Sequence, residues 1–212
     1  LEFPHLMKMV ECNQFDTVYH EHFSYLSLLA TEKIMNAARL RVFDIEELAT
    51  HGGSLRIYAC HQNASHETSN KLVKLRAVEA ARGMNTDEYY QNFQNKADLV
   101  RDNFLAFLKD VKAKGKTIAG YGAAAKGNTL INFANVKPDL LPFVCDAAPS
   151  KIGKYLPGCH IPIFAPDRLR THRPDYVIIF PWNIATEIQE QLSDISDLGT
   201  KFAIAVPELM VF

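Results

Sequence analysis

Apolar positions near the start of the chain predict a helix followed by a two-stranded hairpin. Thr31 is expected to cap a helix that continues to about Leu40. Val42–Ile45 and the alternating segment Leu55–Cys60 predict two strands, joined by the glycine turn His51–Ser54. The inner face of the helix is expected to carry Ile34, Met35 and Ala38. This order of elements is typical of the closing part of an α/β domain.

Residues from about 65 to 114 are expected to be helical. The clearer helix should begin near Thr86, because Asp87 and Glu88 favour the positive end of a helix dipole. Gly115 is suited to end it. Its apolar positions advance by three or four residues, and they are Tyr90, Phe93, Ala97, Val100, Phe104, Phe107 and Val111. So wide an apolar face predicts packing on a core rather than a cofactor site.

From Lys116 the chain alternates between apolar runs and helical patterns. The expected strands are Thr117–Tyr121, Leu141–Cys145, Asp175–Phe180 and Lys201–Val206. The expected helices are Ala124–Ala134 and a segment marked by Ile184, Ile188 and Leu192. Near-continuous apolar strands separated by helices indicate a parallel sheet covered on both faces. The predicted fold class is therefore α/β, with a Rossmann-like, doubly wound, mainly parallel sheet in residues 115–212, a helical connector at 63–114 and a separate segment at 1–62.

Composition excludes several classes of protein. The net charge is −1 with 22% charged residues, so bulk electrostatics favour neither nucleic acid nor an anionic membrane. No apolar run reaches the roughly 18 residues of a membrane span. The four cysteines form no C-x-x-C pair, and we expect reduced, partly buried thiols rather than disulfides or zinc ligands. This pattern predicts a cytoplasmic location.

The densest chemistry lies in the run Tyr19-His20-Glu21-His22. Its side chains can supply a general base, a carboxylate partner and a phenol within a few residues. If the run turns helically, Tyr19 and His22 share a face with Glu21 beside it. A metal site is the alternative, but the spacing is not H-E-x-x-H and no third ligand is evident, so no metal is predicted here.

A glycine-rich loop, Gly120-Tyr-Gly-Ala-Ala-Ala-Lys-Gly127, connects the first predicted strand of the sheet to a helix. Glycines there let backbone N–H groups approach a phosphate, and Lys126 could add a positive charge. The spacing G-x-G-x-x-x-x-G differs from both the dinucleotide and the Walker patterns. Asp146 follows the next strand, 146 − 120 = 26 residues on, about where a ribose-binding acid would lie. The alternative is a tight strand–helix turn without a ligand.

Two further segments follow predicted strands. Lys151–Gly158 is a basic, glycine-punctuated loop, which on its own is more typical of a solvated loop. Pro181-Trp182-Asn183 contains the only tryptophan of the chain. Asn183 is suited to cap the next helix, and the Trp–Asn pair is also suited to stack on and bond a base or sugar.

Five motifs in order resemble the sugar C-methyltransferases, which act on nucleotide-linked keto-deoxysugars. They are F-D-T-V-Y-H-E-H-F-S-Y-L-S-L, T-H-G-G-S-L-R, G-Y-G-A-A-A-K-G-N-T-L-I-N, P-S-K-I-G-K-Y-L-P-G-C-H-I-P-I and P-W-N. The resemblance implies three modules: an N-terminal zinc-binding domain, a central S-adenosylmethionine domain and a C-terminal Rossmann-like domain. Residues 1–62 would then be the tail of the central domain. Because Leu1–His5 looks like the end of a buried strand, we expect the chain to be part of a longer enzyme.

The resemblance also implies a mechanism and site residues. His22 would remove the proton next to the sugar ketone, with Glu21 and Tyr19 orienting it or bonding the sugar, and the enolate would take the sulfonium methyl. The nucleotide diphosphate, with thymidine as its nucleoside, would be held by the following residues: Gly120, Tyr121, Gly122, Lys126, Gly127, Asn128, Asp146, Trp182 and Asn183. The loop that binds S-adenosylmethionine would lie upstream of this chain, and zinc only in the N-terminal module, so the chain alone should not methylate.

A different class of function remains open from the residues. The later sheet could be a non-catalytic Rossmann-like module that binds NAD(P), a coenzyme A group or another nucleotide, or one that mediates assembly. The glycine spacing disfavours dinucleotide binding.

Overall fold

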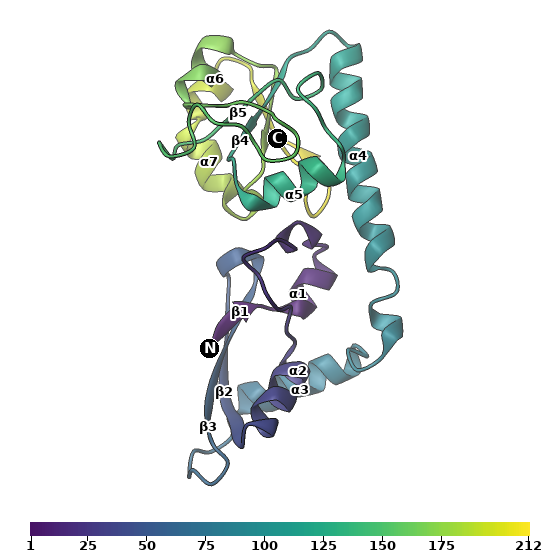
Figure 1. The fold of residues 1–212 in the computed structure, drawn as a ribbon, viewed down its shortest axis with the longest axis vertical. Helices are drawn as coiled ribbons and strands as arrows, with labels where there is room; N and C mark the ends of the chain where they lie inside the picture. The colour runs from purple at the N-terminus through teal and green to yellow at the C-terminus, as the bar shows by residue number, and fades with distance from the viewer. The chain divides into compact units, whose positions relative to one another are not determined.

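A computed structural model describes residues 1–212 as two compact units. Residues 1–15 and 20–96 form the N-terminal unit, and residues 16–19 and 97–212 form the C-terminal unit. The chain is drawn in Figure 1. The division of the chain into modules at 62 and 114 stays a prediction.

The N-terminal unit is an antiparallel sheet with helices beside it. The strand order is β1-β3-β2, and the strands are β1 (Glu2–Pro4), β2 (Leu40–Leu48) and β3 (Ser54–His61). The α-helices are α1 (Leu6–Glu11), α2 (Leu28–Ala37) and α3 (Asn70–Ala81). Single 3-10 turns occur at Thr50–Gly52 and Asp87–Tyr89, and a third, Phe15–Thr17, continues into the C-terminal unit at Asp16. The predicted hairpin is confirmed as β2–β3, and α2 and α3 lie next to it in Figure 1.

The predicted start of the first helix is wrong. Ser27 caps α2, and its Oγ accepts a hydrogen bond from the Ala30 N–H at 3.0 Å. Thr31 is buried one turn inside the helix and donates its hydroxyl to the Ser27 carbonyl. Ile34 was placed on the inner face, yet it is 54% exposed. The buried stripe therefore starts earlier, at Leu28.

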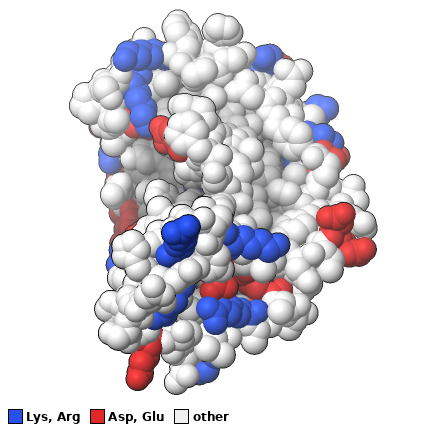
Figure 2. Space-filling view, turned by 60° about the horizontal axis from the view of Figure 1, so that its bottom comes forward, with Lys and Arg blue, Asp and Glu red and all other residues white.

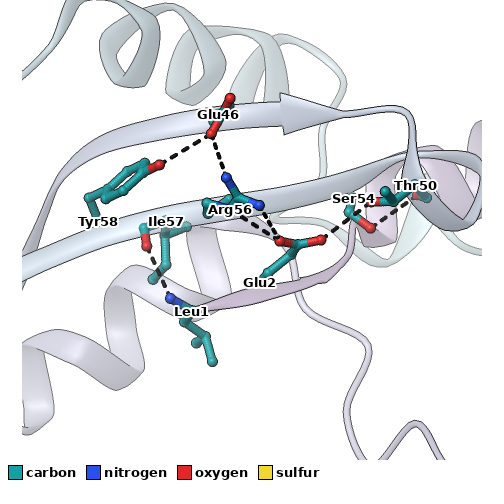
Figure 3. A network of polar contacts seen from close by, with 8 residues as sticks. All are labelled: Leu1, Glu2, Glu46, Thr50, Ser54, Arg56, Ile57 and Tyr58. Carbon is teal, nitrogen blue, oxygen red and sulfur yellow. Dashed lines mark hydrogen bonds and ion pairs between the residues drawn. The ribbon is translucent and has the colours of Figure 1, made fainter.

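Arg56 joins all three strands of this sheet on its exposed face (Figure 3). Its guanidinium lies 2.9 Å from Glu2 on β1 and 3.0 Å from Glu46 on β2, where all three residues are in register. The Tyr58 hydroxyl also donates to Glu46. The hydrogen bond from Arg56 lowers the pKa of Glu2. Solvent screens these contacts, so we assign them to strand register rather than to large stability.

The C-terminal unit is built on a six-stranded sheet with the order β6-β5-β4-β7-β8-β9. All neighbouring pairs are parallel except β8–β9. The strands are β4 (Ile118–Tyr121), β5 (Val144–Cys145), β6 (Ile163–Phe164), β7 (Tyr176–Ile179), β8 (Lys201–Ile204) and β9 (Met210–Val211). The helices are α4 (Phe93–Ala113, of which residues 93–96 belong to the N-terminal unit), α5 (Ala125–Phe133), α6 (Asp167–His172), α7 (Ala185–Gln191) and α8 (Ser193–Ser196), with a 3-10 turn at Trp182–Ile184.

Helices cover both faces of this sheet. One core contains Tyr121 and Ile179 from the sheet together with Ile188 and Ile195 from α7 and α8. On the other side, α4 packs its aromatic stripe on the sheet, and the rings of Phe104 and Phe180 lie 6.4 Å apart. In Figure 1, α4 and α5 lie on one side of the strands and α6 and α7 on the other. The predicted α/β class with a mainly parallel sheet is confirmed.

The ends of α4 show one wrong and one confirmed prediction. A 3-10 turn occupies Asp87–Tyr89, so α4 begins at Phe93 rather than near Thr86. Gly115 does end the helix: its φ is +66°, and the Lys116 N–H donates to the Val111 carbonyl at 3.1 Å. The two-residue strands β6 and β9 were not anticipated, because so short a segment carries no alternation to detect.

The strand order reverses beside β4. The chain runs from β4 to β5 and β6 on one side, then crosses to β7 and β8 on the other. In such sheets, ligands bind outside the carboxyl ends of the strands at the point of reversal.

On the face drawn in Figure 2, Lys and Arg side chains lie among Asp and Glu side chains. No helix is long and apolar enough to cross a bilayer.

Candidate functional site

The predicted nucleotide-binding residues of the C-terminal unit follow three strands at one edge of its sheet. The loop Gly122–Ala124 follows β4, Asp146 follows β5, and Trp182 and Asn183 follow β7. Because these strands are parallel neighbours, their carboxyl ends share one edge. This edge, which we call the rim, is where the strand order reverses.

Close contacts with neighbouring protein atoms explain why glycines occupy the rim loop. Gly122 has φ +89°, and a Cβ there would lie 2.4 Å from Pro181 Cδ. A Cβ on Gly127 would lie 2.6 Å from Phe180, and one on Gly120 equally close. These glycines allow β4 and α5 to approach the end of β7. Their predicted contact with a ligand stays a prediction.

Gly127→Ala is expected to destabilise the C-terminal unit by about 1–3 kcal/mol, because the new methyl group overlaps the Phe180 ring in a packed core. Thermal unfolding followed by Trp182 fluorescence measures this change. A double variant with Phe180→Leu should lose less than the sum of the two single variants. Strict additivity would show that the glycine is required for another reason.

Tyr121 and Asn128 lie in different environments at the rim. The Tyr121 side chain is part of the core, and burial raises the pKa of its phenol. Asn128 lies on α5, where its Oδ1 accepts from the Asn132 amide at 3.2 Å. Asn132 also donates to the Pro157 carbonyl at 3.0 Å. Asn128 is thus linked to the basic loop, whereas Tyr121 is held inside the fold.

The Asp146 carboxylate organises the rim loops. Its Oδ2 accepts from the Ala123 N–H at 2.7 Å and lies 3.1 Å from the Lys151 ammonium. Its Oδ1 accepts from the Ala148 N–H at 2.8 Å. Asp146 is 8% exposed, so the predicted contact with a ribose would have to compete with these three donors. That contact stays a prediction.

Lys126, Trp182 and Asn183 come together as predicted neighbours, and Asp16 joins them. The Lys126 ammonium lies 4.1 Å from the centre of the Trp182 ring and donates to Asn183 Oδ1 at 3.2 Å. The Trp182 indole N–H donates to Asp16 Oδ2 at 2.7 Å. We call these four residues the rim cluster. Asn183 does not cap α7, since Ile184 occupies that position without a side-chain cap.

Burial controls the charges of the rim cluster. Asp16 is 1% exposed, and desolvation raises the pKa of its carboxyl to about 6, although Trp182 and Lys126 oppose the shift. Burial lowers the pKa of Lys126, which Asp16 partly offsets. The cluster therefore holds an acid and a base that each resist charging, as occurs at functional sites more often than elsewhere.

The Tyr19–His22 run is irregular, so the helical turn considered for it does not form. Residues 18–22 form bends and turns. Tyr19 is half-buried and belongs to the C-terminal unit, whereas Glu21 and His22 belong to the N-terminal unit. Glu21 is exposed and His22 half-buried. The proposed roles of these three side chains stay predictions.

The structure adds Tyr25 and His51 to the surroundings of His22. The His51 ring centre lies 6.4 Å from that of His22, with the planes at 82°. The Tyr25 ring lies at the same distance from His22. His51 adopts φ +57° in the turn between β2 and β3. The T-H-G-G-S motif was the available signal for His51, but the pairing depends on how the hairpin folds back.

Metal and thiol chemistry have little support in the structure. Among residues 1–212, no group of three or more His, Cys, Asp or Glu side chains could hold a metal ion. All four cysteines are free thiols, as predicted, but Cys12 is exposed rather than partly buried. Burial raises the pKa of Cys145 to about 12, which leaves it unreactive at neutral pH.

Comparison with known proteins identifies the class. Residues 49–207 match the family model described as the C-methyltransferase C-terminal domain, and the chain belongs to this family. It is also 35% identical over 208 residues to the C-methyltransferase NovU of Streptomyces niveus. That match covers 98% of this chain and 50% of the relative, so the chain spans about half the length of the curated relative. The predicted family is confirmed.

Proposed function

We propose that the chain is the C-terminal part of an S-adenosylmethionine-dependent C-methyltransferase acting on a nucleotide-linked keto-deoxysugar. The observation that carries this proposal is the match to a C-methyltransferase across 98% of the chain. The half-buried imidazole of His22 and the polar rim of the C-terminal sheet support it. S-adenosylmethionine would supply the methyl group, and we place the loop that binds it outside this chain.

In this proposal, His22 acts as the general base. It takes the proton from the carbon next to the sugar ketone, and the electron pair of that C–H bond becomes the enolate. S-adenosylmethionine, when bound, would supply the methyl group to the enolate carbon, the methyl–sulfur bond breaking and its electron pair staying on the departing thioether. Tyr19 and Glu21 orient the base or bond the sugar. Hydrogen-bond donors near the enolate oxygen would supply the largest part of the rate enhancement.

The nucleotide diphosphate is placed at the rim, with thymidine as the proposed nucleoside. Helix α5 begins there at Ala125, and its N-cap Ala124 makes no side-chain hydrogen bond, so the N–H groups of the first turn are suited to bind a phosphate. Lys126 supplies positive charge, and Trp182 with Asn183 offers a ring and an amide for a base or sugar. This proposed site is completed by Gly120–Gly122, Gly127, Asn128 and Asp146.

Calorimetry with a thymidine diphosphate sugar tests the binding half of the proposal. Lys126→Met is expected to weaken binding at least tenfold, because it removes the buried charge but keeps the length of the side chain. Lys116→Met is the matched control: Lys116 also lies over an aromatic ring, at 5.4 Å from Tyr176, but precedes β4 at the opposite edge of the sheet. Absence of heat at millimolar ligand would contradict the proposal.

A dinucleotide-binding module is the second candidate, favoured by the Rossmann-like strand order. A fluorescence titration with NADH separates the two, because tight nicotinamide binding would contradict the sugar assignment. The occupied Asp146 carboxylate and the glycine spacing both disfavour it.

A further inference from the structure

Asp16 and Trp182 are separated by 166 positions in the sequence but form one short hydrogen bond of 2.7 Å. Asp16 lies directly before Thr17, Val18 and Tyr19, and these four residues belong to the C-terminal unit. The residues on either side of the four, up to Phe15 and from His20, belong to the N-terminal unit. The Tyr19–His22 run therefore starts on the C-terminal unit.

The surroundings of Asp16 are largely apolar. Asp16 lines one small pocket with Gly127 and Leu130 of α5, with Phe180 after β7, and with Ala205 and Val206 after β8. The charged and polar groups that act on its carboxyl are the Trp182 indole, the Lys126 ammonium and its own backbone N–H. The second carboxylate oxygen, Oδ1, is buried and accepts no hydrogen bond.

A carboxylate buried in such surroundings contributes little to the stability of the fold. An apolar residue of similar volume would fill the same pocket without the desolvation cost, and replacing buried ionic groups in this way is often neutral or stabilising. The carboxylate instead provides a directional contact, because its hydrogen bond fixes one oxygen of the 16–19 segment against the indole nitrogen at the rim. A role in placing that segment accounts for both the burial and the bond.

We propose that the Asp16–Trp182 hydrogen bond holds the segment Asp16–Tyr19 on the C-terminal unit and so positions the start of the Tyr19–His22 run. Asp16 is then a positioning residue. It contacts neither the base nor the sugar, and it acts through Trp182 and the backbone that follows it. The consequence for catalysis rests on the proposed function, whereas the anchoring itself does not.

Amide hydrogen exchange of the 212-residue chain tests the anchoring. Asp16→Leu removes the acceptor and should speed exchange across residues 16–19 at least tenfold. Asp16→Asn keeps an oxygen that accepts from the indole and should recover most of the protection. Trp182→Phe removes the donor by an independent route and should match Asp16→Leu. Asp175→Asn is the control, because Asp175 bonds Thr117 at an exposed site of the same unit. Unchanged exchange in both bond-breaking variants would overturn the proposal.

Fluorescence provides a second readout, since Trp182 is the only tryptophan. Its emission should change with a midpoint near pH 6 as the Asp16 carboxyl ionises against the indole, with Lys126 as the neighbouring ammonium. Asp16→Asn should abolish this transition, and Asp175→Asn should retain it. Survival of the transition in Asp16→Asn would overturn the pairing of the two side chains.

Kinetics of the whole methyltransferase then separate the two proposals. Asp16→Leu should lower kcat at least tenfold and leave KM for the nucleotide sugar within about threefold, with rescue by Asp16→Asn. Wild-type kcat in Asp16→Leu would overturn the positioning role. If the wild-type protein neither binds nor methylates a nucleotide sugar, the proposed function fails, and the exchange and fluorescence results still decide the anchoring.

Discussion

Replacing His22 with glutamine is expected to slow proton exchange at the sugar carbon by about 10²–10⁴-fold, the usual contribution of a general base. Glutamine keeps hydrogen-bonding atoms at a similar distance from the backbone but takes up no proton at neutral pH. The measurement uses the whole methyltransferase that carries this chain. Loss of the proton signal next to the ketone is followed by NMR in deuterated buffer, so that enolate formation is observed apart from methyl transfer.

The surroundings of His22 explain why we assign the role of base to His22 rather than to His20. His22 is half-buried, and the ring centres of Tyr25 and His51 each lie 6.4 Å from its own, whereas His20 is exposed. A base works best when it is held in one orientation within reach of the proton. His20→Gln is therefore the matched control from the same run, and it should change the exchange rate by less than about threefold.

A variant of His51 tests whether His51, rather than His22, is the base. His51→Asn removes the second imidazole but suits the positive φ of this position, because asparagine tolerates that conformation. If His51 only supports His22, His51→Asn should slow exchange by less than His22→Gln does. Should His51→Asn stop exchange while His22→Gln leaves it intact, the role of base would pass to His51.

Sequence patterns were sufficient where an element is long and apolar. β4, β7 and β8 contain few polar residues and are buried along all or most of their length, so their apolar runs were clear in the sequence. The start of α2 was not clear in the sequence, because Ser27 and Thr31 are both good capping residues. The choice between them depends on Glu79, which lies on another helix and is distant in the sequence.

The candidate site was predictable only where neighbours follow parallel strands. Lys126 and Asn183 were expected at one edge of the sheet, and they meet there. Asp16 was missed because nothing near it in the chain indicates an indole 166 positions away. His51 was missed for a similar reason, since the hairpin β2–β3 decides which side chain approaches His22.

Glu79→Ala is expected to destabilise the N-terminal unit by about 3–5 kcal/mol, the usual cost of removing one partner from a buried polar network. Glu79 lies on α3 and is 3% exposed. Its Oε1 lies 2.8 Å from His5 Nε2 and accepts from the Leu28 N–H at 2.7 Å, and its Oε2 accepts from the Leu29 N–H at 2.9 Å. These bonds satisfy the first turn of α2 from outside the helix.

Two variants separate the buried network from ordinary charge loss. Glu79→Gln keeps the shape but turns one acceptor into a donor that faces backbone N–H groups, so it should cost about 1–3 kcal/mol. Glu32→Gln is the matched control, because Glu32 pairs with Arg76 on the same two helices at a more exposed position. Its cost should stay below about 1 kcal/mol.

The sole tryptophan allows the two units to be followed separately. Trp182 belongs to the C-terminal unit, so its fluorescence reports that unit, whereas far-ultraviolet circular dichroism reports both. In denaturant, Glu79→Ala should move an early circular dichroism transition to lower concentration and leave the Trp182 transition in place. An unmoved circular dichroism midpoint would show that His5 and the start of α2 find other partners. In that case the carboxylate of Glu79 would not be what joins α3 to the first turn of α2.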